Sequence, residues 1–315
     1  MSKHRDHGGG LDAAVARYGG EKFDWIDLST GINPVPYPLG TIEQDAWTAL
    51  PDAAAQDGLI QAARAFWDVP HEAAILAAPG ASSLIARLPM LWPAGRAAIR
   101  TPTYNEHAGA FEAHGWTIGA SNADKGTTVQ VAVHPNNPDG RMWHADAFTA
   151  PVTIIDESFC DIAPEASHIA RTARPDTIVL KSFGKFWGLA GLRLGFAIGA
   201  PDLIDRLSAL IGPWAVSGPA LTIGRDALKD PDWAEATRAR LAEDAARLDG
   251  LVTAKGARLV GGTPLFRLYE VDDARAWQKR LAQGRVWSRI FPYSERWIRL
   301  GLPAPDGWAQ VEAAL

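Results

Sequence analysis

Short apolar runs alternate with amphipathic stretches along residues 41–212. The apolar runs at 74–77, 97–100, 129–133, 152–155, 177–180 and 194–198 are predicted to be strands. Between several of them, apolar residues recur at helical spacing, at 81–91, 106–114 and 145–150. This alternation predicts an α/β domain with a mostly parallel sheet that is covered by helices. In such sheets, ligands bind beyond the carboxyl ends of the strands.

The pattern changes on both sides of this domain. Residues 1–40 are rich in glycine and proline, which predicts an N-terminal arm that lies on a surface and has no core of its own. Residues 41–212 form the predicted large domain. Residues 213–315 contain a long helical pattern at 232–255 and strand patterns at 258–260, 266–271 and 297–300. They predict a smaller α+β domain at the C-terminus.

Composition narrows the possible partners. The formal net charge is −5 and there is no long run of Lys and Arg, so we expect no nucleic-acid partner. No apolar run approaches the length of a membrane span, and residues 1–7 are polar, unlike a signal peptide. The single cysteine, Cys160, excludes an intrachain disulfide. These features predict a cytoplasmic protein without membrane association.

The strongest chemical signal is a lysine in a tight turn between two apolar runs. Lys185 follows the run at 177–180, Ser182 precedes it in the turn, and Arg193 comes eight residues later. A lysine there can form a Schiff base with an aldehyde cofactor, while a hydroxyl and a guanidinium can bind its phosphate. The alternative is a surface turn with a solvated lysine, which the length and order of the pattern disfavour.

This segment resembles the lysine segment of fold-type I enzymes that use pyridoxal 5′-phosphate (PLP), within the aminotransferase class I and II superfamily. The resemblance implies that Lys185 carries PLP and that Ser182 and Arg193 hold its phosphate. It also implies a large domain with a mostly parallel sheet and a smaller C-terminal domain.

Two turns after predicted strands support the resemblance. Asp156 ends a buried run, and a carboxylate there can keep a pyridine nitrogen protonated; the alternative is a helix cap or a solvated loop residue. The turn at 134–140 resembles the Asn-Pro-X-Asn-Pro-Thr-Gly turn of these enzymes, which implies that Asn137 donates to the ring hydroxyl oxygen of the cofactor. His134 and Asp139 depart from that pattern.

Two weaker segments complete the predicted cofactor site. Gly80, Ala81 and Ser82 follow the run at 74–77 and open a helical pattern, where backbone amides can bind phosphate. His107 falls where relatives have the side chain that stacks on the cofactor ring, and many of them have Tyr there. An imidazole can also stack, although a lone histidine is more often structural.

Arginines near the C-terminus and residues of the arm are candidates for substrate binding. Arg289 and Arg299 suit a carboxylate or a phosphate, and the segment of Arg299 resembles the family strand that holds an anionic group of the substrate. His7, Gly8 and Asn33 lie in two stretches that match one subgroup of the family. His7 is also compatible with a metal site, but no other ligands are spaced for one, so we predict no metal.

Within the superfamily, the chain resembles the L-threonine O-3-phosphate decarboxylases of cobalamin biosynthesis. The features are the start at His7 and Gly8, the segment 27–34, the short segment between the two arginines, and Phe159, where histidinol-phosphate aminotransferases usually have Tyr. Leu50 departs from both groups, whose Tyr at this position reaches the PLP phosphate of the partner subunit.

The resemblance implies a homodimer that converts the small phosphorylated substrate L-threonine O-3-phosphate to (R)-1-amino-2-propanol O-2-phosphate and CO2. The alternative is transamination like that of the histidinol-phosphate aminotransferases, in which a different substrate bond is broken. A more remote alternative is a non-catalytic PLP-binding protein, as in transcription regulators that carry a DNA-binding domain before this fold.

Overall fold

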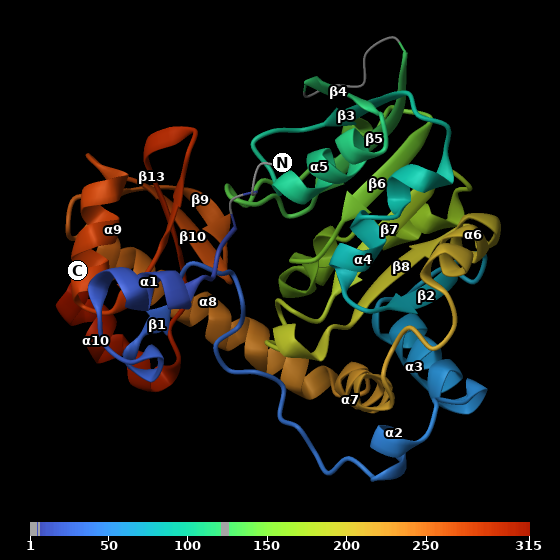
Figure 1. Ribbon diagram of the computed structural model, residues 1–315, viewed down its shortest axis with the longest axis horizontal. Coiled ribbons are helices and arrows are strands. Elements are labelled where there is room, and N and C mark those ends of the chain that lie inside the picture. Colours follow the sequence, from blue (N-terminus) through green and yellow to red (C-terminus); the bar gives the residue numbers. More distant parts are fainter. Residues whose placement is uncertain (1–4, 6, 121–125) are drawn as a thin grey trace. The chain divides into compact units, whose positions relative to one another are not determined.

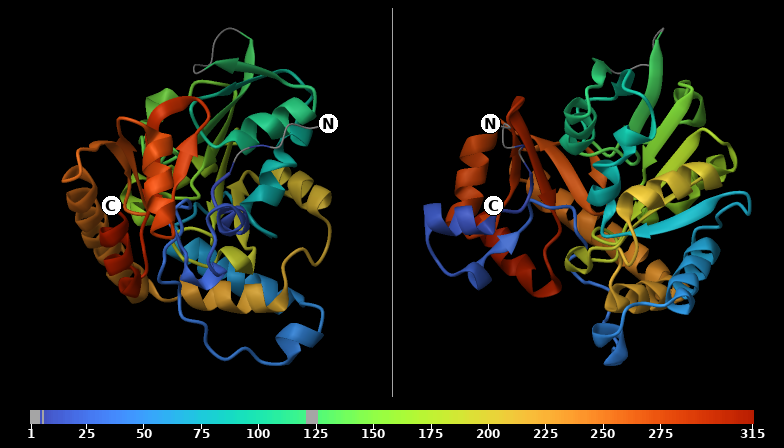
Figure 2. Two further views of the ribbon diagram at one scale, coloured as in Figure 1. Left: turned by 60° about the vertical axis from the view of Figure 1, so that its left-hand side comes forward. Right: turned by 45° about the vertical axis from the view of Figure 1, so that its right-hand side comes forward.

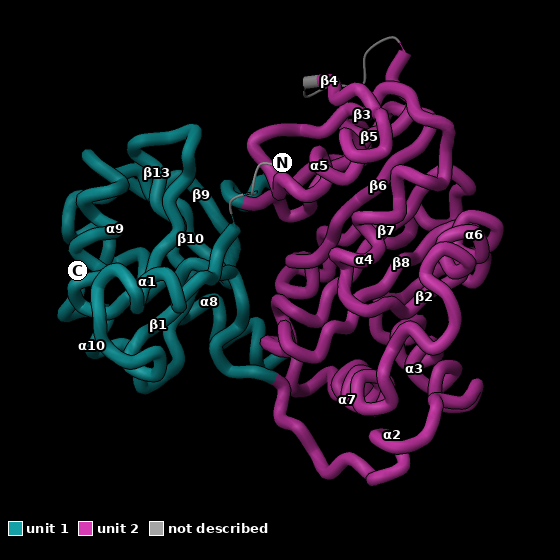
Figure 3. The backbone as a smooth tube through the Cα atoms, in the orientation of Figure 1, with its two compact units in different colours: residues 1–36, 138–141, 235–315 teal, residues 37–137, 142–234 magenta. Residues whose placement is uncertain are grey.

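The computed structural model describes residues 5, 7–120 and 126–315, so residues 1–4 and 6 of the predicted arm lie outside the described part. Backbone contacts divide the chain into two compact units (Figure 3). The larger unit comprises residues 37–137 and 142–234, and the smaller one comprises residues 1–36, 138–141 and 235–315. The division differs from the predicted 1–40, 41–212 and 213–315, because residues 1–36 share a unit with the C-terminal region.

A seven-stranded sheet is the centre of the larger unit (Figures 1 and 2). Its strands are β2 (Ala74–Ala78), β3 (Arg96–Ile99), β4 (Thr117–Ala120), β5 (Thr127–Val133), β6 (Val152–Asp156), β7 (Thr177–Ser182) and β8 (Gly195–Gly199). They follow the order β2-β8-β7-β6-β5-β3-β4, and β8 is antiparallel to both of its neighbours. The other pairs are parallel, which confirms the predicted fold class.

Because of this topology, several chain segments meet at one edge of the sheet. The carboxyl ends of β2, β3, β5, β6 and β7 lie at the same edge as the beginning of the reversed strand β8. Most apolar residues of the central strands are fully buried, and they include Val131, Ile154, Ile178 and Leu180. A buried sheet holds its strand ends in fixed register, so the loops at this edge begin from defined positions.

Helices cover the sheet of the larger unit (Figure 1). The helices of the larger unit are α2 (Asp45–Thr48), α3 (Ala53–Phe66), α4 (Ala81–Ile85), α5 (Asn105–Ala113), α6 (Pro201–Ile211) and α7 (Gly218–Leu228), and α2 packs on α7. Helix α7 packs on α3. A Cβ at Gly224 of α7 would lie 2.5 Å from Leu194 and 3.0 Å from Leu59, so the glycine permits this close packing. The packing explains why residues 213–234 belong to the larger unit.

The helix predicted at 145–150 is wrong. The chain forms one 3-10 turn, η3 (Ala145–Ala147), and Phe148 is extended, with φ −102° and ψ 94°. The buried side chain of Gln130 donates to the carbonyl of Ala147 at 2.7 Å and accepts from the amide of Thr149 at 3.1 Å. A tertiary partner therefore satisfies backbone groups that a helix would otherwise satisfy itself.

The smaller unit combines the N-terminal and C-terminal regions. Strand β1 (Ile26–Asp27) pairs in parallel with β11 (Val286–Trp287), and an antiparallel sheet has the order β12-β13-β10-β9. The bounds are β9 (Arg258–Thr263), β10 (Phe266–Glu270), β12 (Arg289–Phe291) and β13 (Ser294–Gly301), with helices α1 (Leu11–Tyr18), α9 (Ala274–Gln283), α10 (Trp308–Ala314) and α8 (Pro231–Thr253), whose residues from 235 on belong to this unit.

Aromatic packing attaches residues 1–36 to the rest of the smaller unit. The ring centroids of Tyr18 and Trp25 lie 6.3 Å and 6.4 Å from that of Trp287. Burial of such large rings contributes more than the short pairing of β1 with β11. None of the described helices has both the length and the apolar character needed to cross a lipid bilayer.

Candidate active site

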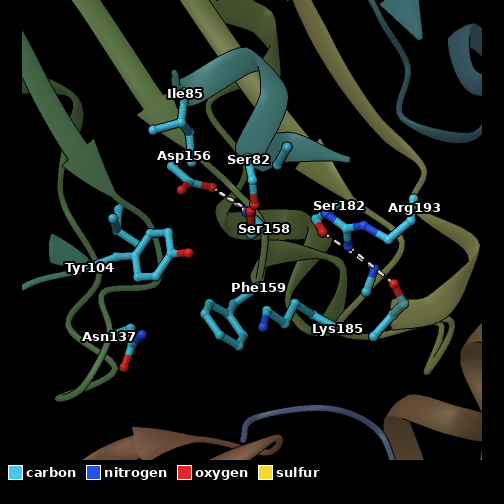
Figure 4. Close-up of a pocket in the computed structure, with 14 residues that line it drawn as sticks. Ser82, Ile85, Tyr104, Asn137, Asp156, Ser158, Phe159, Ser182, Lys185 and Arg193 are labelled. Carbon is cyan, nitrogen blue, oxygen red and sulfur yellow. Dashed lines mark hydrogen bonds between the residues drawn. The ribbon is translucent and has the colours of Figure 1, made fainter. Parts of the chain in front are cut away.

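A pocket lies in the larger unit, at the sheet edge where the strand ends meet (Figure 4). Seven residues predicted to hold a cofactor line it, namely Ala81, Ser82, Asn137, Asp156, Ser182, Lys185 and Arg193. Phe159, noted in the sequence as a position of Tyr in relatives, also lines it, together with residues that the sequence did not single out, among them Ile85, Tyr104 and Ser158. The topology therefore brings together residues that are more than one hundred positions apart in the sequence.

The turn that carries Lys185 is anchored by buried aromatic rings on both sides. Phe183 and Phe186 are fully buried, and the amide of Phe183 donates to the carbonyl of Leu194 at 3.0 Å. The amide of Gly188 donates to the carbonyl of Lys185 at 3.0 Å, which closes the turn. The Lys185 Nζ lies 5.4 Å from the centroid of the Phe159 ring, on the pocket side (Figure 4). The amine is thus held on a fixed backbone but borders the cavity.

Asp156 is a buried carboxylate with a complete set of donors. Its Oδ2 lies 2.8 Å from His107 Nε2, and its Oδ1 accepts from the Ser158 amide at 3.0 Å and from the Ser158 hydroxyl at 2.5 Å. Burial by itself raises the pKa of Asp156, but the hydrogen bond and charge of His107, followed by Ser158, outweigh it, so this pKa lies below its ordinary value. Asp156 is therefore an anion at neutral pH.

The structure places His107 behind Asp156 and not along the pocket. The imidazole is fully buried in α5, and its Nε2 is directed at the carboxylate. Tyr104, at the N-cap of the same helix, lines the cavity, and its hydroxyl makes a hydrogen bond with Ser82. Figure 4 shows the Tyr104 ring between Asp156 and Asn137. Tyr104 therefore borders the pocket, whereas His107, three residues later, lies behind Asp156.

Asn137 owes its position to its buried neighbour Asn136. The Asn136 side chain accepts from the hydroxyl of Thr103 at 2.7 Å and donates to the carbonyl of Pro102 at 3.0 Å. These bonds attach the loop after β5 to the loop after β3. Asn137 then faces the cavity from the end of β5.

The glycine at position 80 makes room for a guanidinium. Gly80 has φ +80°, and a Cβ there would lie 2.5 Å from Nη2 of Arg193. Arg193 itself is in the left-handed region, with φ 54°, and its Nη1 donates to the carbonyl of Ala190 at 3.1 Å. A Cβ at Gly195 would lie 2.4 Å from the Ala81 amide. Both glycines allow the beginning of α4 and the loop before β8 to approach closely.

A second group of predicted residues lies in the smaller unit. Arg289 and Arg299 are directly opposite in the antiparallel pair β12–β13, so both side chains lie on one face. Arg289 donates to the carbonyl of His7, and Arg299 donates to the carbonyl of Ser29 at 2.5 Å. Burial, followed by the charge of Arg289, lowers the pKa of Arg299 to about 10. Two cations on one face repel each other, and each guanidinium can bind an anion through bidentate hydrogen bonds.

Gly8 and Asn33 hold the N-terminal segment in the smaller unit. A Cβ at Gly8 would lie 2.4 Å from the carbonyl oxygen of Ser29 and 3.5 Å from Nη2 of Arg299. Asn33 is buried, and its Oδ1 accepts from the Val35 amide at 3.0 Å and from Arg240 at 2.7 Å. The side-chain oxygen of Asn33 therefore stabilises the fold, and a contact of Asn33 with a ligand stays a prediction.

Comparisons with known proteins show the family of the chain. The family model for aminotransferase class I and II matches residues 25–311. The chain belongs to this family. It is 40% identical to a threonine-phosphate decarboxylase of Sinorhizobium sp, over 97% of this chain and 95% of that protein. It is 37% identical to a threonine-phosphate decarboxylase of Pseudomonas aeruginosa, over 98% and 97% of the two chains.

The fold also matches members of the family with solved structures. A histidinol-phosphate aminotransferase from Sinorhizobium meliloti, solved in complex with pyridoxal 5′-phosphate, superposes with a TM-score of 0.83 at 20% identity and covers 98% of this chain and 93% of that one. Membership of the family confirms that the chain is a PLP-dependent enzyme. Within the described residues, no three potential metal ligands are grouped in one place.

Proposed function

We propose that the protein decarboxylates L-threonine O-3-phosphate, with PLP bound at Lys185. The observation that carries the proposal is the convergence of Lys185, Asp156 and the phosphate-binding candidates on one pocket. The chain is also 40% identical, over 97% of its length, to a protein named threonine-phosphate decarboxylase. The product is then (R)-1-amino-2-propanol O-2-phosphate, an intermediate for cobalamin biosynthesis.

The residues of the pocket suit the parts of PLP. Ala81 and Ser82 present backbone amides at the beginning of α4, and Ser182 and Arg193 add a hydroxyl and a guanidinium, which together suit a phosphate. Because Gly80 has no side chain, the Arg193 guanidinium fits beside these amides. Asn137 offers an amide donor to the ring hydroxyl oxygen.

Asp156 is the proposed partner of the pyridine nitrogen. It keeps its negative charge because His107 and Ser158 stabilise the carboxylate. When bound, PLP supplies an electron sink for the bond that breaks at the substrate Cα. The carboxylate of Asp156 would hold a proton on the ring nitrogen, and Lys185, as an ammonium, would donate a proton to Cα in place of the lost CO2.

Tyr104 replaces His107 as the proposed ring-stacking residue. The Tyr104 ring borders the pocket, whereas the His107 ring is fully buried against Asp156. Burial, then the charges of Glu106 and Asp156, raise the pKa of Tyr104, so its hydroxyl stays protonated. We assign His107 to support of the carboxylate.

Arg289 and Arg299 are the proposed receptors of the two anionic groups of the substrate. Their like charges lie opposite each other on one face, and a phosphate or carboxylate relieves the repulsion through bidentate hydrogen bonds. Phosphothreonine carries one of each group. His7 and Gly8 lie beside these arginines, and we include them in the substrate site.

We also propose that the enzyme is a homodimer. Leu39, Trp47 and Leu50 are large apolar side chains exposed by 59%, 67% and 69% on the larger unit. Apolar groups this exposed favour association with a second copy. Leu50 occupies the position at which relatives of the family have the Tyr that reaches the partner's cofactor.

A single-turnover experiment without any keto acid tests the proposal. Phosphothreonine should release CO2, and the cofactor should return to its original absorbance, because a decarboxylase regenerates the Lys185-bound form. Conversion of the cofactor to its amine form by histidinol phosphate, with phosphothreonine inert, would instead establish the transaminase alternative.

A further inference from the structure

Three charged side chains form a buried group behind the pocket. Lys181, Glu157 and Asp161 are exposed by only 1%, 1% and 4%. The Nζ of Lys181 lies 2.8 Å from Glu157 Oε2 and 3.4 Å from Asp161 Oδ1. We call these three residues the Lys181 cluster. None of them lines the pocket, so the chemistry proposed above makes no direct use of them.

The Glu157 carboxylate has donors on both of its oxygens. Oε2 accepts from the Ser167 hydroxyl at 2.6 Å in addition to Lys181, and Oε1 accepts from the His168 amide at 2.6 Å. Burial raises the pKa of Glu157, but the charge of Lys181 and these hydrogen bonds outweigh it and lower the pKa below its ordinary value. Glu157 is therefore an ionised group with one defined orientation.

Two indole rings fix the orientation of Asp161. Its Oδ1 accepts from Trp67 Nε1 and its Oδ2 accepts from Trp187 Nε1, both at 3.0 Å. The Lys181 ammonium also lies 5.6 Å from the centroid of the Trp67 ring. Burial lowers the pKa of Lys181, but the two carboxylates outweigh it and raise this pKa above its ordinary value. The cluster thus holds two anions around one cation.

The cluster connects the two strands whose ends carry the catalytic residues. Asp156 and Ser182 face the pocket, and the adjacent residues Glu157 and Lys181 face away from it, because side chains alternate along extended backbone. The Glu157 amide donates to the carbonyl of Leu180 at 3.0 Å and extends the pairing of β6 with β7. The ion pair therefore fixes the strand ends one residue away from the pocket.

The same cluster also holds the two loops that follow these strands. Lys185 lies between two residues that both reach Asp161, namely Lys181 through its ammonium and Trp187 through its indole. Phe159, whose ring lies 5.4 Å from the Lys185 Nζ, comes between the two carboxylates in the sequence. The loop of the lysine and the loop of the neighbouring ring are thus attached to one buried centre.

Stability alone gives no reason for this arrangement. Replacement of a buried ion pair by apolar residues of similar volume is often neutral or stabilising, whereas a fully satisfied buried network fixes one geometry. We propose that Lys181, Glu157 and Asp161 are positioning residues that fix the Lys185 turn and the end of β6 for cofactor binding and catalysis. The inference rests on the proposed function only in taking Lys185 as the cofactor lysine.

A double variant separates positioning from stability. Lys181→Met alone leaves two buried carboxylates without their cation and should lower the melting temperature of the cofactor-free protein by roughly 5–10 °C. Lys181→Met with Glu157→Gln removes one charge of each sign, so the net charge of the cluster is unchanged, and we expect the melting temperature to return close to that of the wild type.

Cofactor affinity should not recover with stability. In the double variant we expect the Kd for PLP, measured by absorbance titration, to stay about 10-fold or more above that of the wild type. The kcat should fall by a similar factor while KM for phosphothreonine changes little. Lys181→Arg, which keeps the cation, should lie between the wild type and the double variant in PLP affinity.

Matched controls keep the outcomes distinct. Arg267→Met with Asp249→Asn removes a bidentate ion pair from the smaller unit and should leave PLP affinity unchanged. A double variant of Lys181 and Glu157 that recovers both melting temperature and PLP affinity would show that the cluster is structural only. Failure of the wild type to bind PLP at Lys185, judged by borohydride labelling, would contradict the proposed function instead.

Discussion

The pocket of the larger unit and the arginine pair of the smaller unit differ in the charges that they bring together. In the pocket, the anion Asp156 is surrounded by donors from His107 and Ser158. On the face of β12 and β13, two cations lie opposite each other, and the described contacts include a backbone carbonyl for each. The Asp156 carboxylate is hydrogen-bonded on both oxygens before any ligand binds, while the two arginines offer cations to an anion.

This difference corresponds to different ligands. A cofactor that stays bound through many turnovers suits a preorganised site, in which side chains are held before the ligand arrives. A substrate anion that enters and leaves in each turnover suits a site in which two cations lie opposite each other on one face. Variants in each unit should therefore affect different measurements.

The largest expected effect is that of Lys185→Ala on the pocket. Loss of the amine should abolish covalent attachment of PLP and lower kcat by about 10⁴-fold or more. The wild type should be yellow and should lose its colour on borohydride reduction, with the label on Lys185. Lys229→Ala, at the C-cap of α7, is the control and should keep full activity.

Peptide mapping after reduction decides between the two lysines of this segment. Lys181 is buried in its ion pair with Glu157, and we expect no label on it. A reduced peptide labelled at Lys181 would refute the assignment of Lys185.

Asp156→Asn should have the next largest effect on kcat. The neutral amide cannot stabilise a protonated ring nitrogen, so we expect kcat to fall by about 10²–10³-fold while the far-UV spectrum stays that of the wild type. A variant with bound PLP and nearly normal kcat would show that Asp156 is not the ring partner.

The same variant has a consequence for acid stability. Since the folded-state pKa of Asp156 is depressed, its ionisation contributes stability that is present above the unfolded-state pKa of about 4 and is lost as the pH falls through the folded-state pKa. Asp156→Asn should therefore lose less stability than the wild type on acidification below pH 4.

Arg299→Gln should change substrate use without changing the pocket. Removal of one cation should raise KM for phosphothreonine and lower kcat/KM by the equivalent of about 2–5 kcal/mol, while the Kd for PLP stays that of the wild type. For the same reason, unphosphorylated threonine should be a very poor substrate of the wild type. Arg296→Gln, an exposed position in the same strand, is the matched control.

The smallest expected effect is stabilisation of the arginine face by a simple anion. Inorganic phosphate at ten times its Kd should stabilise the PLP-bound protein by about 1.4 kcal/mol, and this shift in melting temperature should be smaller in Arg289→Gln. The pKa of Arg299 lies at about 10, so its cation persists below that pH and is lost above it. The phosphate effect should therefore weaken above pH 10, and an equal shift in the variant would place the anion elsewhere.

The sequence alone determined the residues that depend on local turn chemistry. Asp156 directly follows an apolar run, and Asn137, Ser182 and Lys185 lie in the turns after such runs. A buried strand that ends in a turn restricts where the next residues point. The strand pattern also gave the correct fold class, because burial on both faces produces continuous apolar runs.

Only the tertiary structure decided which side chains face the cavity within one segment. Tyr104 and His107 are three positions apart, and both are aromatic residues at the beginning of α5. The spacing does not reveal that the helix turns His107 towards Asp156, because that depends on how α5 packs against the sheet. The sequence therefore predicts stacking by His107, whereas the placement of the two rings favours Tyr104, which borders the pocket.

The sequence pattern likewise does not predict which distant segments of the chain contact each other. Residues 1–36 share a unit with the C-terminal region through β1, β11 and a cluster of aromatic rings, and Lys181 meets Asp161 across the end of the sheet. Local propensity specifies turns and periodicity over a few residues, whereas the partner of a buried charge or ring is set by packing of distant segments. The sequence thus determined the chemistry at each strand end, and the tertiary structure decided what holds it in place.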